Sequence, residues 1–429
     1  MSEIEKKALS PILRMGRWFL VTSFILGFLA FITLVALYIY NTEEKAPTEL
    51  YPESYWGVHI TNFVFYMALG FGAVMVSILL RLLKTDWAAA VNRIAEIAAV
   101  LAFVVAGFNI IFEIGDLLWL VDIFLYGQLD SPFIWDGLLL IFFIIAAAAY
   151  MYMPMVPDLT RTSLRVHEIK AFYRFLSFGY IGNPIQRVRL RKMVLRMATL
   201  VFLALLLMTT LLAWAFEEVS PHPVWNEALS GPLFVAEAIV LALAIIIIML
   251  AVLRSAVGLQ DFITRTLFVR MGKAMVYAIL LYLPLFVIGT FTMTSGDDSM
   301  FVSFSDSIWV NEFAPITWGI AFFGLVIPLL IAIQPRLASI RFVVLAATMT
   351  ALVLIFKIYM VVVPGITRHL NAYGDGIHWP TLVEWVLMVG SLSFFIILMV
   401  SMTRFFPMVS IWEVDDQIRG EDGKGVGPG

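Results

Sequence analysis

Apolar residues recur along the chain in runs of about twenty or more, and short polar segments separate these runs. A helix rises by about 1.5 Å per residue, so a run of this length crosses a hydrocarbon core about 30 Å thick. The runs that meet this requirement are residues 18–40, 56–83, 91–112, 133–154, 195–216, 232–253, 271–292, 313–334, 340–363 and 382–405. The pattern predicts an all-α, polytopic membrane protein with about ten transmembrane helices.

A weak internal repeat relates the second run to the sixth, because each starts at an aromatic rim and ends at an arginine. It predicts two four-helix bundles, built from runs two to five and six to nine, with the first and last helices at the periphery. The division is 1–17 (cytoplasmic segment), 18–54 (first peripheral helix and outer loop), 55–220 (first bundle), 221–365 (second bundle), 366–414 (last peripheral helix) and 415–429 (disordered cytoplasmic tail).

The connections between the runs alternate in charge. The amino-terminal segment and the even-numbered connections are rich in Lys and Arg, whereas the odd-numbered connections carry Asp and Glu. Because basic connections stay on the cytoplasmic side, both termini are predicted to be cytoplasmic, in the inner membrane of a prokaryote. The longest basic connection, 158–192, is interpreted as a topology anchor beside anionic lipids, and a partner-binding loop is the alternative.

Composition narrows the function further. With 62% hydrophobic residues, 14% charged residues and a mean hydropathy of +0.94, the chain is unlike a soluble domain. It contains no cysteine, which excludes disulfides and thiolate-held iron–sulfur clusters within it. The five histidines lie near run ends or in connections, so we expect no haem and no metal site in this chain. We also expect no nucleic-acid partner. If the protein transfers electrons, the metal centres belong to partner subunits.

Polar groups gather at the predicted outer ends of runs two, three and four. Helical spacing places three of them on one face of the second run, and three more at the end of the third. The fourth run opens with a Trp-Asp pair. For this aspartate the alternative is an acid that merely favours a helix start. These residues are His59, Asn62 and Tyr66; Asn109, Glu113 and Asp116; and Trp135 and Asp136.

Three further charged residues lie inside the runs. Glu96 is near the inner end of the third run, within a turn of Arg93, and a local ion pair between these two is favoured. Glu237 and Lys357 lie at similar depth in the second bundle. An unpaired charge at this depth is costly, so we expect Glu237 and Lys357 to form an ion pair.

Two motifs resemble a known family. The segment EIGDLLW followed by SPFIWD is similar to the NrfD/PsrC family of quinone-interacting membrane subunits, found in polysulfide-reductase-like enzymes and in alternative complex III. Members show (D/H)-x-G-R-P and then S-P-x-x-W-(D/G). Glu113 falls where the family has Asp or His, and Asp136 falls on its Trp-Asp. Asp116 and Leu117 stand where the family usually has Arg and Pro, which removes a cation from the site.

The resemblance implies a quinone site at the outer end of the first bundle, with menaquinone or ubiquinone as substrate. It also implies an iron–sulfur subunit at the outer face, with molybdopterin or multihaem cytochrome subunits elsewhere in the complex. We expect the residues to divide into catalytic Glu113, Asp136 and Asp116; quinone-binding His59, Asn62, Tyr66, Phe63 and Trp135; and a proton path of Glu96, Glu237 and Lys357.

The chemistry of quinones agrees with this assignment, because their reduction needs two electrons and two protons and therefore titratable groups beside the ring. Glu113 is the expected proton carrier, since it ends a helix, where the dipole disfavours a carboxylate. The competing hypotheses are a secondary transporter, for which the Glu237 and Lys357 charges would serve coupling, and a structural anchor for an outer enzyme. Paired Gly or Pro interruptions, typical of transporter sites, are not evident in the runs.

Overall fold

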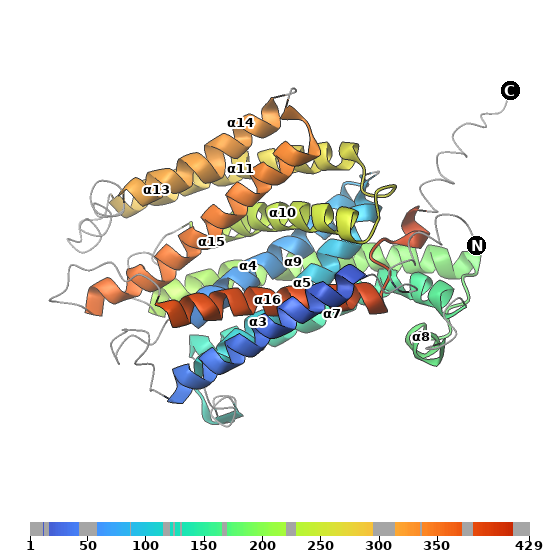
Figure 1. Ribbon diagram of the computed structural model, residues 1–429, viewed down its shortest axis with the longest axis horizontal. Coiled ribbons are helices and arrows are strands. Elements are labelled where there is room, and N and C mark those ends of the chain that lie inside the picture. Colours follow the sequence, from blue (N-terminus) through green and yellow to red (C-terminus); the bar gives the residue numbers. More distant parts are fainter. Residues whose placement is uncertain are drawn as a thin grey trace.

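A computed structural model describes residue 12 and residues 17–42, 58–85, 87–114, 121–122, 125–128, 131–164, 170–219, 229–294, 314–334, 337–370 and 381–414. The regular structure in these residues is helical (Figure 1). The helices are α3 (Arg17–Thr42), α4 (Val58–Leu82), α5 (Ala88–Ile114), α7 (Pro132–Ser163), α8 (Lys170–Leu176), α9 (Pro184–Val219), α10 (Ser230–Ala256), α11 (Arg265–Thr294), α13 (Ala314–Ala321), η2 (Phe322–Val326), α14 (Ile327–Ile333), α15 (Ile340–Leu370) and α16 (Leu382–Phe405).

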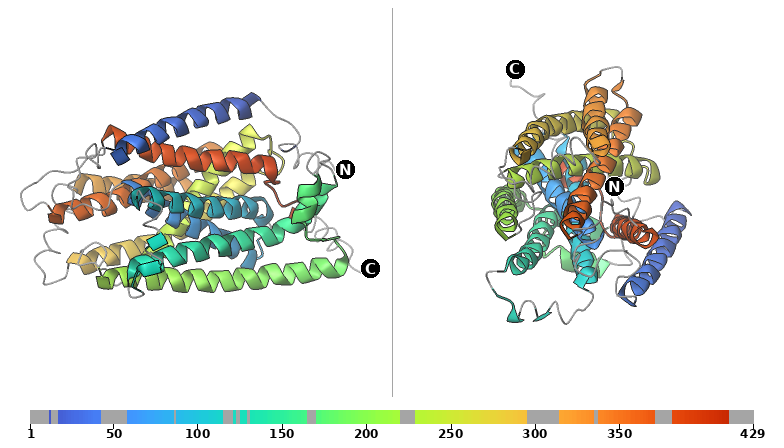
Figure 2. Two further views of the ribbon diagram at one scale, coloured as in Figure 1. Left: turned by 90° about the horizontal axis from the view of Figure 1, so that it is seen from below. Right: turned by 90° about the vertical axis from the view of Figure 1, so that its left-hand side faces the viewer.

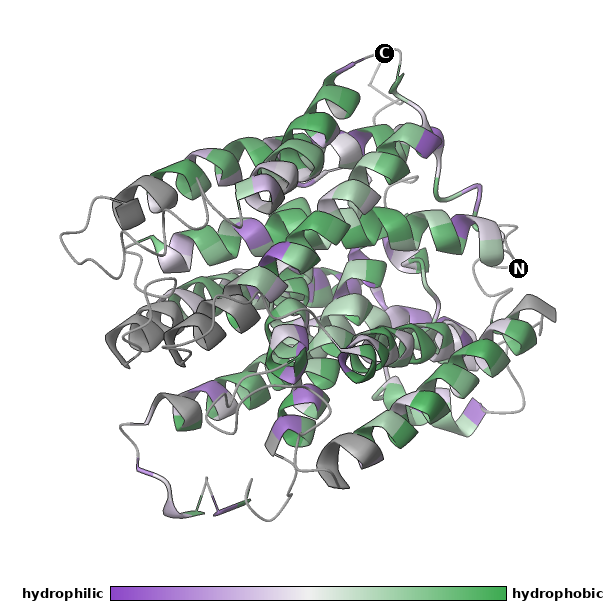
Figure 3. Ribbon diagram, turned by 60° about the vertical axis from the view of Figure 1, so that its left-hand side comes forward, coloured by the Kyte–Doolittle hydropathy of each residue, from purple (hydrophilic) through white to green (hydrophobic). Residues whose placement is uncertain are grey.

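Nine helices of the described chain are long and apolar enough to cross a membrane. They correspond to nine of the ten predicted runs, and apolar residues dominate these helices (Figure 3). The chain is therefore an all-α, polytopic membrane protein, as predicted. The helices α7 and α9 extend further inward than their runs, to Ser163 and from Pro184. The runs were ended where charges begin, but a helix continues beyond the membrane whenever its backbone hydrogen bonds are satisfied.

The remaining run, 313–334, which is the eighth, is not one regular helix. It consists of α13, the π-helical turn η2 and α14. A Cβ on Gly324, within η2, would lie 2.2 Å from the Val353 side chain, so only glycine fits this contact with α15. The Gly324 carbonyl accepts a 2.9 Å hydrogen bond from the Thr350 hydroxyl. The π turn thus exposes a backbone acceptor that α15 satisfies.

The helix at the centre of the molecule is α4. In its most apolar stretch, 89% of the residues are buried, against 17% in α3. Small residues allow this burial. A Cβ on Gly72 would lie 1.8 Å from the Ala238 carbonyl oxygen and 2.7 Å from the Ala242 Cβ, so glycine lets α4 and α10 pack backbone to backbone. This contact joins the two halves of the molecule.

The remaining helices pack around this central pair. On one side α4, α5, α7 and α9 contact one another, and on the other α10 contacts α11 and α15, which also pack on α14. This grouping follows the predicted order of two four-helix bundles, while the residue boundaries of the domains stay a prediction. The pair α3 and α16 lies side by side at the edge, as the end-on view in Figure 2 shows.

The last long helix, α16, is more than a peripheral element. Its Gly390 packs on α3, where a Cβ would lie 1.9 Å from the Thr33 hydroxyl oxygen. Its other side packs on α5 and α4. The start of α3 and the end of α16 share one end of the molecule, because Arg404 lies 4.1 Å above the Phe19 ring. That this end is cytoplasmic stays a prediction.

Candidate functional site

A buried polar network lies where α4, α5 and α16 meet, near the start of α4. Following the predicted topology, we call this the outer end. His59 Nδ1 lies 3.5 Å from Asn109 Oδ1, a long contact in which the protonated Nδ1 tautomer would donate. Asn109 Nδ2 donates to the Val105 carbonyl at 2.8 Å and to Ser391 Oγ at 3.0 Å. The Tyr66 hydroxyl is hydrogen-bonded to the Ser391 side chain. We call His59, Tyr66, Asn109 and Ser391 the outer network.

Aromatic rings surround the outer network. The ring centroids of His59 and Phe112 are 6.2 Å apart, and Phe112 stacks on Phe108 at 6.1 Å. Phe108 in turn meets Phe394 of α16 edge-on at 5.3 Å. The Phe108 side chain is 39% exposed, so this aromatic wall reaches the surface of the helix bundle. The outer network therefore combines hydrogen-bonding groups with an apolar wall of aromatic rings.

Two further predicted binding residues flank this network on α4. Asn62 is buried, and its Nδ2 has no hydrogen-bond partner among the described residues. A buried amide without a partner costs about 1–3 kcal/mol, so such a group calls for an explanation. Phe63 is buried in the main hydrophobic core. His59, Asn62 and Tyr66 follow the helical spacing predicted from the sequence, and all three are buried.

The predicted catalytic carboxylates lie at the same end of the first bundle. Glu113 is in the last turn of α5, directly after Phe112, and Asp136 is in the second turn of α7, which packs beside α5. Both side chains are partly buried. Trp135 is 52% exposed on α7. Asp116 lies outside the described residues. On α5, Glu113 lies one helical turn beyond Asn109 of the outer network.

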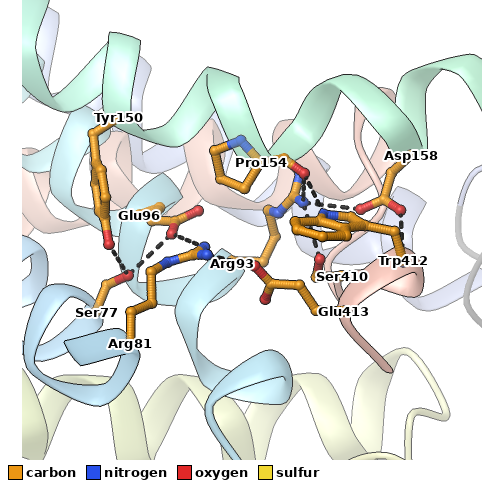
Figure 4. Close-up of polar contacts among 10 residues, drawn as sticks. All are labelled: Ser77, Arg81, Arg93, Glu96, Tyr150, Pro154, Asp158, Ser410, Trp412 and Glu413. Carbon is orange, nitrogen blue, oxygen red and sulfur yellow. Dashed lines mark hydrogen bonds and ion pairs between the residues drawn. The ribbon is translucent and has the colours of Figure 1, made fainter. Parts of the chain in front are cut away.

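A second polar network occupies the inner end of the same bundle (Figure 4). Glu96 of α5 is paired with Arg81 of α4, with 2.5 Å between Arg81 Nη2 and Glu96 Oε1. The same carboxylate oxygen accepts a 3.0 Å bond from Ser77, whose hydroxyl is 3.2 Å from the Tyr150 hydroxyl. Arg81 also pairs with Glu413, close to the end of the described chain. Glu96 of α5 is therefore bound by two residues of α4, and these link it to Tyr150 of α7 and to Glu413.

Arg93 anchors the other half of this cluster. Its Nη2 lies 2.9 Å from Asp158 Oδ2 on α7 and donates to the Pro154 carbonyl at 3.0 Å. The segment after α16 closes the cluster, because the Trp412 backbone N–H donates to Asp158 Oδ1 at 3.1 Å and its indole donates to the Pro154 carbonyl at 2.7 Å. We call the following residues the inner network: Ser77, Arg81, Arg93, Glu96, Tyr150, Asp158, Ser410, Trp412 and Glu413.

The sequence favoured a local ion pair between Arg93 and Glu96, and this prediction is wrong. Both residues find partners on other helices, 65 residues away for Arg93 and 15 residues away for Glu96. The reason is that the two side chains leave α5 in different directions, Arg93 toward α7 and Glu96 toward α4. Sequence reasoning missed Asp158 and Glu413. The available signal was that Arg93 and Asp158 are charges in otherwise apolar helical surroundings.

An aromatic layer separates the two networks. Phe71 of α4 meets Phe103 and Phe143 edge-on, with ring centroids 5.5 and 4.5 Å apart, and Phe103 stacks on Phe143 at 5.8 Å. All three are buried. A Cβ on Gly70 would lie 2.6 Å from the Phe103 ring, so the ring is packed against the α4 backbone. Along α4, this layer lies between Tyr66 of the outer network and Ser77 of the inner one.

In the second bundle, the expected ion pair is confirmed. Lys357 of α15 is paired with Glu237 of α10. The Lys357 ammonium also lies 5.7 Å from the centroid of the Tyr282 ring and 5.8 Å from that of Phe286, both on α11. The positive charge of Lys357 on α15 is therefore stabilised by side chains of α10 and α11. An intramembrane lysine is costly unless paired, and here an anion and two aromatic faces stabilise it.

Metal-ligating side chains are not clustered in the described part of the chain, where no three His, Cys, Asp or Glu residues are arranged to hold an ion. The absence of haem and of iron–sulfur clusters from this chain stays an expectation from the sequence.

Comparison with known families matches residues 46–369 to the family described as polysulphide reductase, NrfD. The match covers about three quarters of the 429 residues, from before α4 almost to the end of α15. It thus includes both four-helix groups and leaves α16 outside. No curated protein matches the chain. On the extent of the family match, the chain belongs to the NrfD family of polysulphide reductase.

Proposed function

We propose that this chain is the quinone-reactive membrane subunit of a respiratory oxidoreductase complex, and that it binds quinone or quinol at its outer end. The outer network carries the proposal: buried hydrogen-bonding side chains from α4, α5 and α16 lie against a wall of Phe108, Phe112 and Phe394. A quinone head group is a flat apolar ring with two carbonyl acceptors. It needs both a wall for the ring and donors for the oxygens.

The unsatisfied amide of Asn62 fits this role. Its Nδ2 is buried without a protein partner, and a quinone carbonyl would accept its hydrogen bond. His59 supplies a second polar group one turn away, since residues three apart lie on the same helix face. We assign His59, Asn62 and Tyr66 to binding of the head group, and Phe63 and Trp135 to the surrounding walls.

Proton exchange is assigned to the carboxylates at the outer rim. Glu113 ends α5, where the exposed carbonyls of the last turn disfavour a negative charge. Asp136 lies in the second turn of α7, at the same end of the first bundle. Glu113 is therefore the proposed proton carrier, Asp136 a fixed hydrogen-bond acceptor, and Asp116 a further acid on the proton route. Quinol oxidation at this site would release its two protons toward the outer side.

The remaining charged residues belong to a proposed proton path. Glu237 and Lys357 form the polar element in the middle of the second bundle. Glu96 is the buried acid of the inner network, and the Phe71, Phe103 and Phe143 layer stands between it and the outer network. We therefore place Glu96 on the inner side of the proposed proton path. No continuous chain of polar side chains among the described residues joins Glu96 to the quinone site.

The proposed partner subunits fit a quinone site at the outer end of the first bundle. An iron–sulfur subunit docked at the outer face would exchange electrons with the quinone over a short distance, and molybdopterin or multihaem cytochrome subunits would complete the complex. The proposed location is the cytoplasmic membrane of a prokaryote.

Glu113→Gln tests the proposal. We expect quinone turnover by the assembled complex to fall about 100-fold, the usual scale for losing a general acid or base, while the complex stays intact on native gels. Asp122→Asn is the matched control, because Asp122 is an exposed acid in the same connection and its loss should leave turnover unchanged. Normal turnover by Glu113→Gln would refute the assignment.

A further inference from the structure

The start of α9 extends beyond the membrane-spanning part of the helix. α9 has 36 residues, which corresponds to about 54 Å at 1.5 Å per residue. A hydrocarbon core is about 30 Å thick. The apolar run begins near residue 195, so we expect the first three turns of α9 to lie outside the hydrocarbon core, on the side of the lipid headgroups. Figure 2 shows this long helix beside α7, with its first turns near α8.

A groove of about 580 Å³ follows one face of these turns. Positions 185, 188–189, 192 and 196 repeat with helical spacing, so they form a single stripe. The stripe alternates apolar and basic side chains. The lining residues are Pro184, Ile185, Val188, Arg189, Lys192, Met193 and Arg196.

The three basic residues in the groove have no side-chain partner. Arg189, Lys192 and Arg196 form neither an ion pair nor a side-chain hydrogen bond within the described part of the chain. This contrasts with Arg81 and Arg93 of the inner network, each of which is paired with a carboxylate. Three cations on one stripe repel one another unless an anion lies between them.

Apolar side chains beside these cations are exposed. Ile185 is 74% exposed and Val188 58% exposed. The preceding segment, which includes α8, shows the same character with large exposed side chains: Phe172, Phe175, Phe178 and Ile181. Basic residues beside exposed Phe and aliphatic side chains are typical of helices that lie at the membrane–water interface. This second observation supports lipid, rather than bulk water, as the surroundings of the groove.

We propose that the α9 groove binds an anionic phospholipid of the cytoplasmic leaflet. The phosphate would lie between Arg189, Lys192 and Arg196, and an acyl chain would cover Val188 and Met193. The charges of groove and headgroup are complementary, and the apolar lining matches the chain of a lipid but not a free anion. Basic pockets at the cytoplasmic ends of transmembrane helices bind acidic lipids in this way.

The test uses the full-length protein purified in a neutral detergent, with binding of fluorescent phosphatidylglycerol as the readout. Removing one cation should weaken binding about five-fold at low salt, and the triple variant Arg189→Gln, Lys192→Gln, Arg196→Gln about 100-fold. Arg187→Gln is the matched control, because Arg187 is on the same turns but outside the groove. It should bind within two-fold of wild type. Equal binding by the triple variant would overturn the proposal.

Two further arms separate a lipid from other anions. Val188→Asn keeps every positive charge, and therefore the topology signal, but removes an apolar contact. It should weaken phosphatidylglycerol binding several-fold and leave binding of inorganic phosphate unchanged. Phosphatidylcholine should not compete. If inorganic phosphate displaces the lipid at equal concentration, or phosphatidylcholine binds equally well, the groove is not a site for anionic lipid.

Discussion

The two polar networks of the first bundle lie on the same helices and differ in chemistry. The inner network is ionic: Arg81 and Arg93 are each paired with carboxylates at 2.5–2.9 Å, and the network joins α4, α5, α7 and the segment after α16. The outer network is neutral, and it includes a 3.5 Å contact at His59 beside the unsatisfied amide of Asn62. Both networks leave some buried polar atoms without a partner among the described residues, including Arg81 Nε, Arg93 Nε and Glu96 Oε2 in the inner one. What distinguishes the inner network is that its charges are held in ion pairs.

This difference indicates different roles. Buried charges are tolerated only when they are paired and hydrogen-bonded, so the inner network has a structural explanation, namely that it fastens residues 410–413 to the bundle. Neutral groups with spare capacity cost less to keep open, and a substrate that enters and leaves requires such a site. The comparison therefore predicts that mutations in the inner network reduce stability, while mutations in the outer network reduce quinone binding.

Breaking the inner network should have the largest effect. Arg93→Met leaves Asp158 buried without its cation, and we expect a loss of about 3–5 kcal/mol in the free energy of unfolding. Thermal unfolding in detergent and the amount of protein in the membrane measure it. Arg270→Met is the control, because Arg270 is exposed and its replacement should change stability little. Wild-type stability of Arg93→Met would contradict a structural role for the inner network.

The pair in the second bundle should behave like the inner network but less strongly, since the Lys357 side chain is 18% exposed. Lys357→Met strands Glu237, with an expected loss of about 2.5–3.5 kcal/mol. The double variant Glu237→Leu, Lys357→Met should be more stable than Lys357→Met alone, because a lone buried charge is worse than none. Unfolding measurements on both variants decide this. Equal stability of the two variants would show that the residues are not energetically coupled.

The smallest effect on stability, and a specific effect on binding, is expected at Asn62. Asn62→Leu removes a donor without a protein partner, so stability should be unchanged or slightly higher. The KM for quinone should rise about 10-fold, the size expected for one hydrogen bond. Asn92→Leu is the matched control: Asn92 is also buried with an unpaired amide oxygen, but on the inner half of α5. An equal rise in KM for Asn92→Leu would contradict the assignment of quinone binding to the outer end of the bundle alone.

The hydrophobic pattern was enough to predict nine of the spans and their order, because each must be apolar over the thickness of a bilayer. It could not predict the π turn around Gly324, which depends on the position of Val353 on α15. It also began α9 too late, at residue 195 instead of Pro184, since charges mark the membrane boundary and not the start of a helix. A local hydrophobic pattern predicts where a helix can span the membrane, but it does not predict how the helix packs against its neighbours.

The candidate site shows the same limit. The face formed by His59, Asn62 and Tyr66 was predicted from helical spacing, and Asn109 from its place at the end of the next run. Ser391, which joins Asn109 to Tyr66, was missed because it lies 282 residues from Asn109. Likewise, Glu413 is 332 residues from Arg81. A serine in an apolar helix carries no signal until the fold shows which helix it faces.

Labelling with a photoreactive quinone analogue would locate the bound quinone in the assembled complex. The intact complex is illuminated with the analogue at low occupancy, and the modified peptides are identified by mass spectrometry. We expect labels on the outer parts of α4, α5 and α16, within residues 58–66, 105–113 and 387–395, and natural quinone should compete these labels away. Competable labels concentrated instead at the inner end, around Ser77, Glu96 and Tyr150, would contradict a quinone site at the outer end.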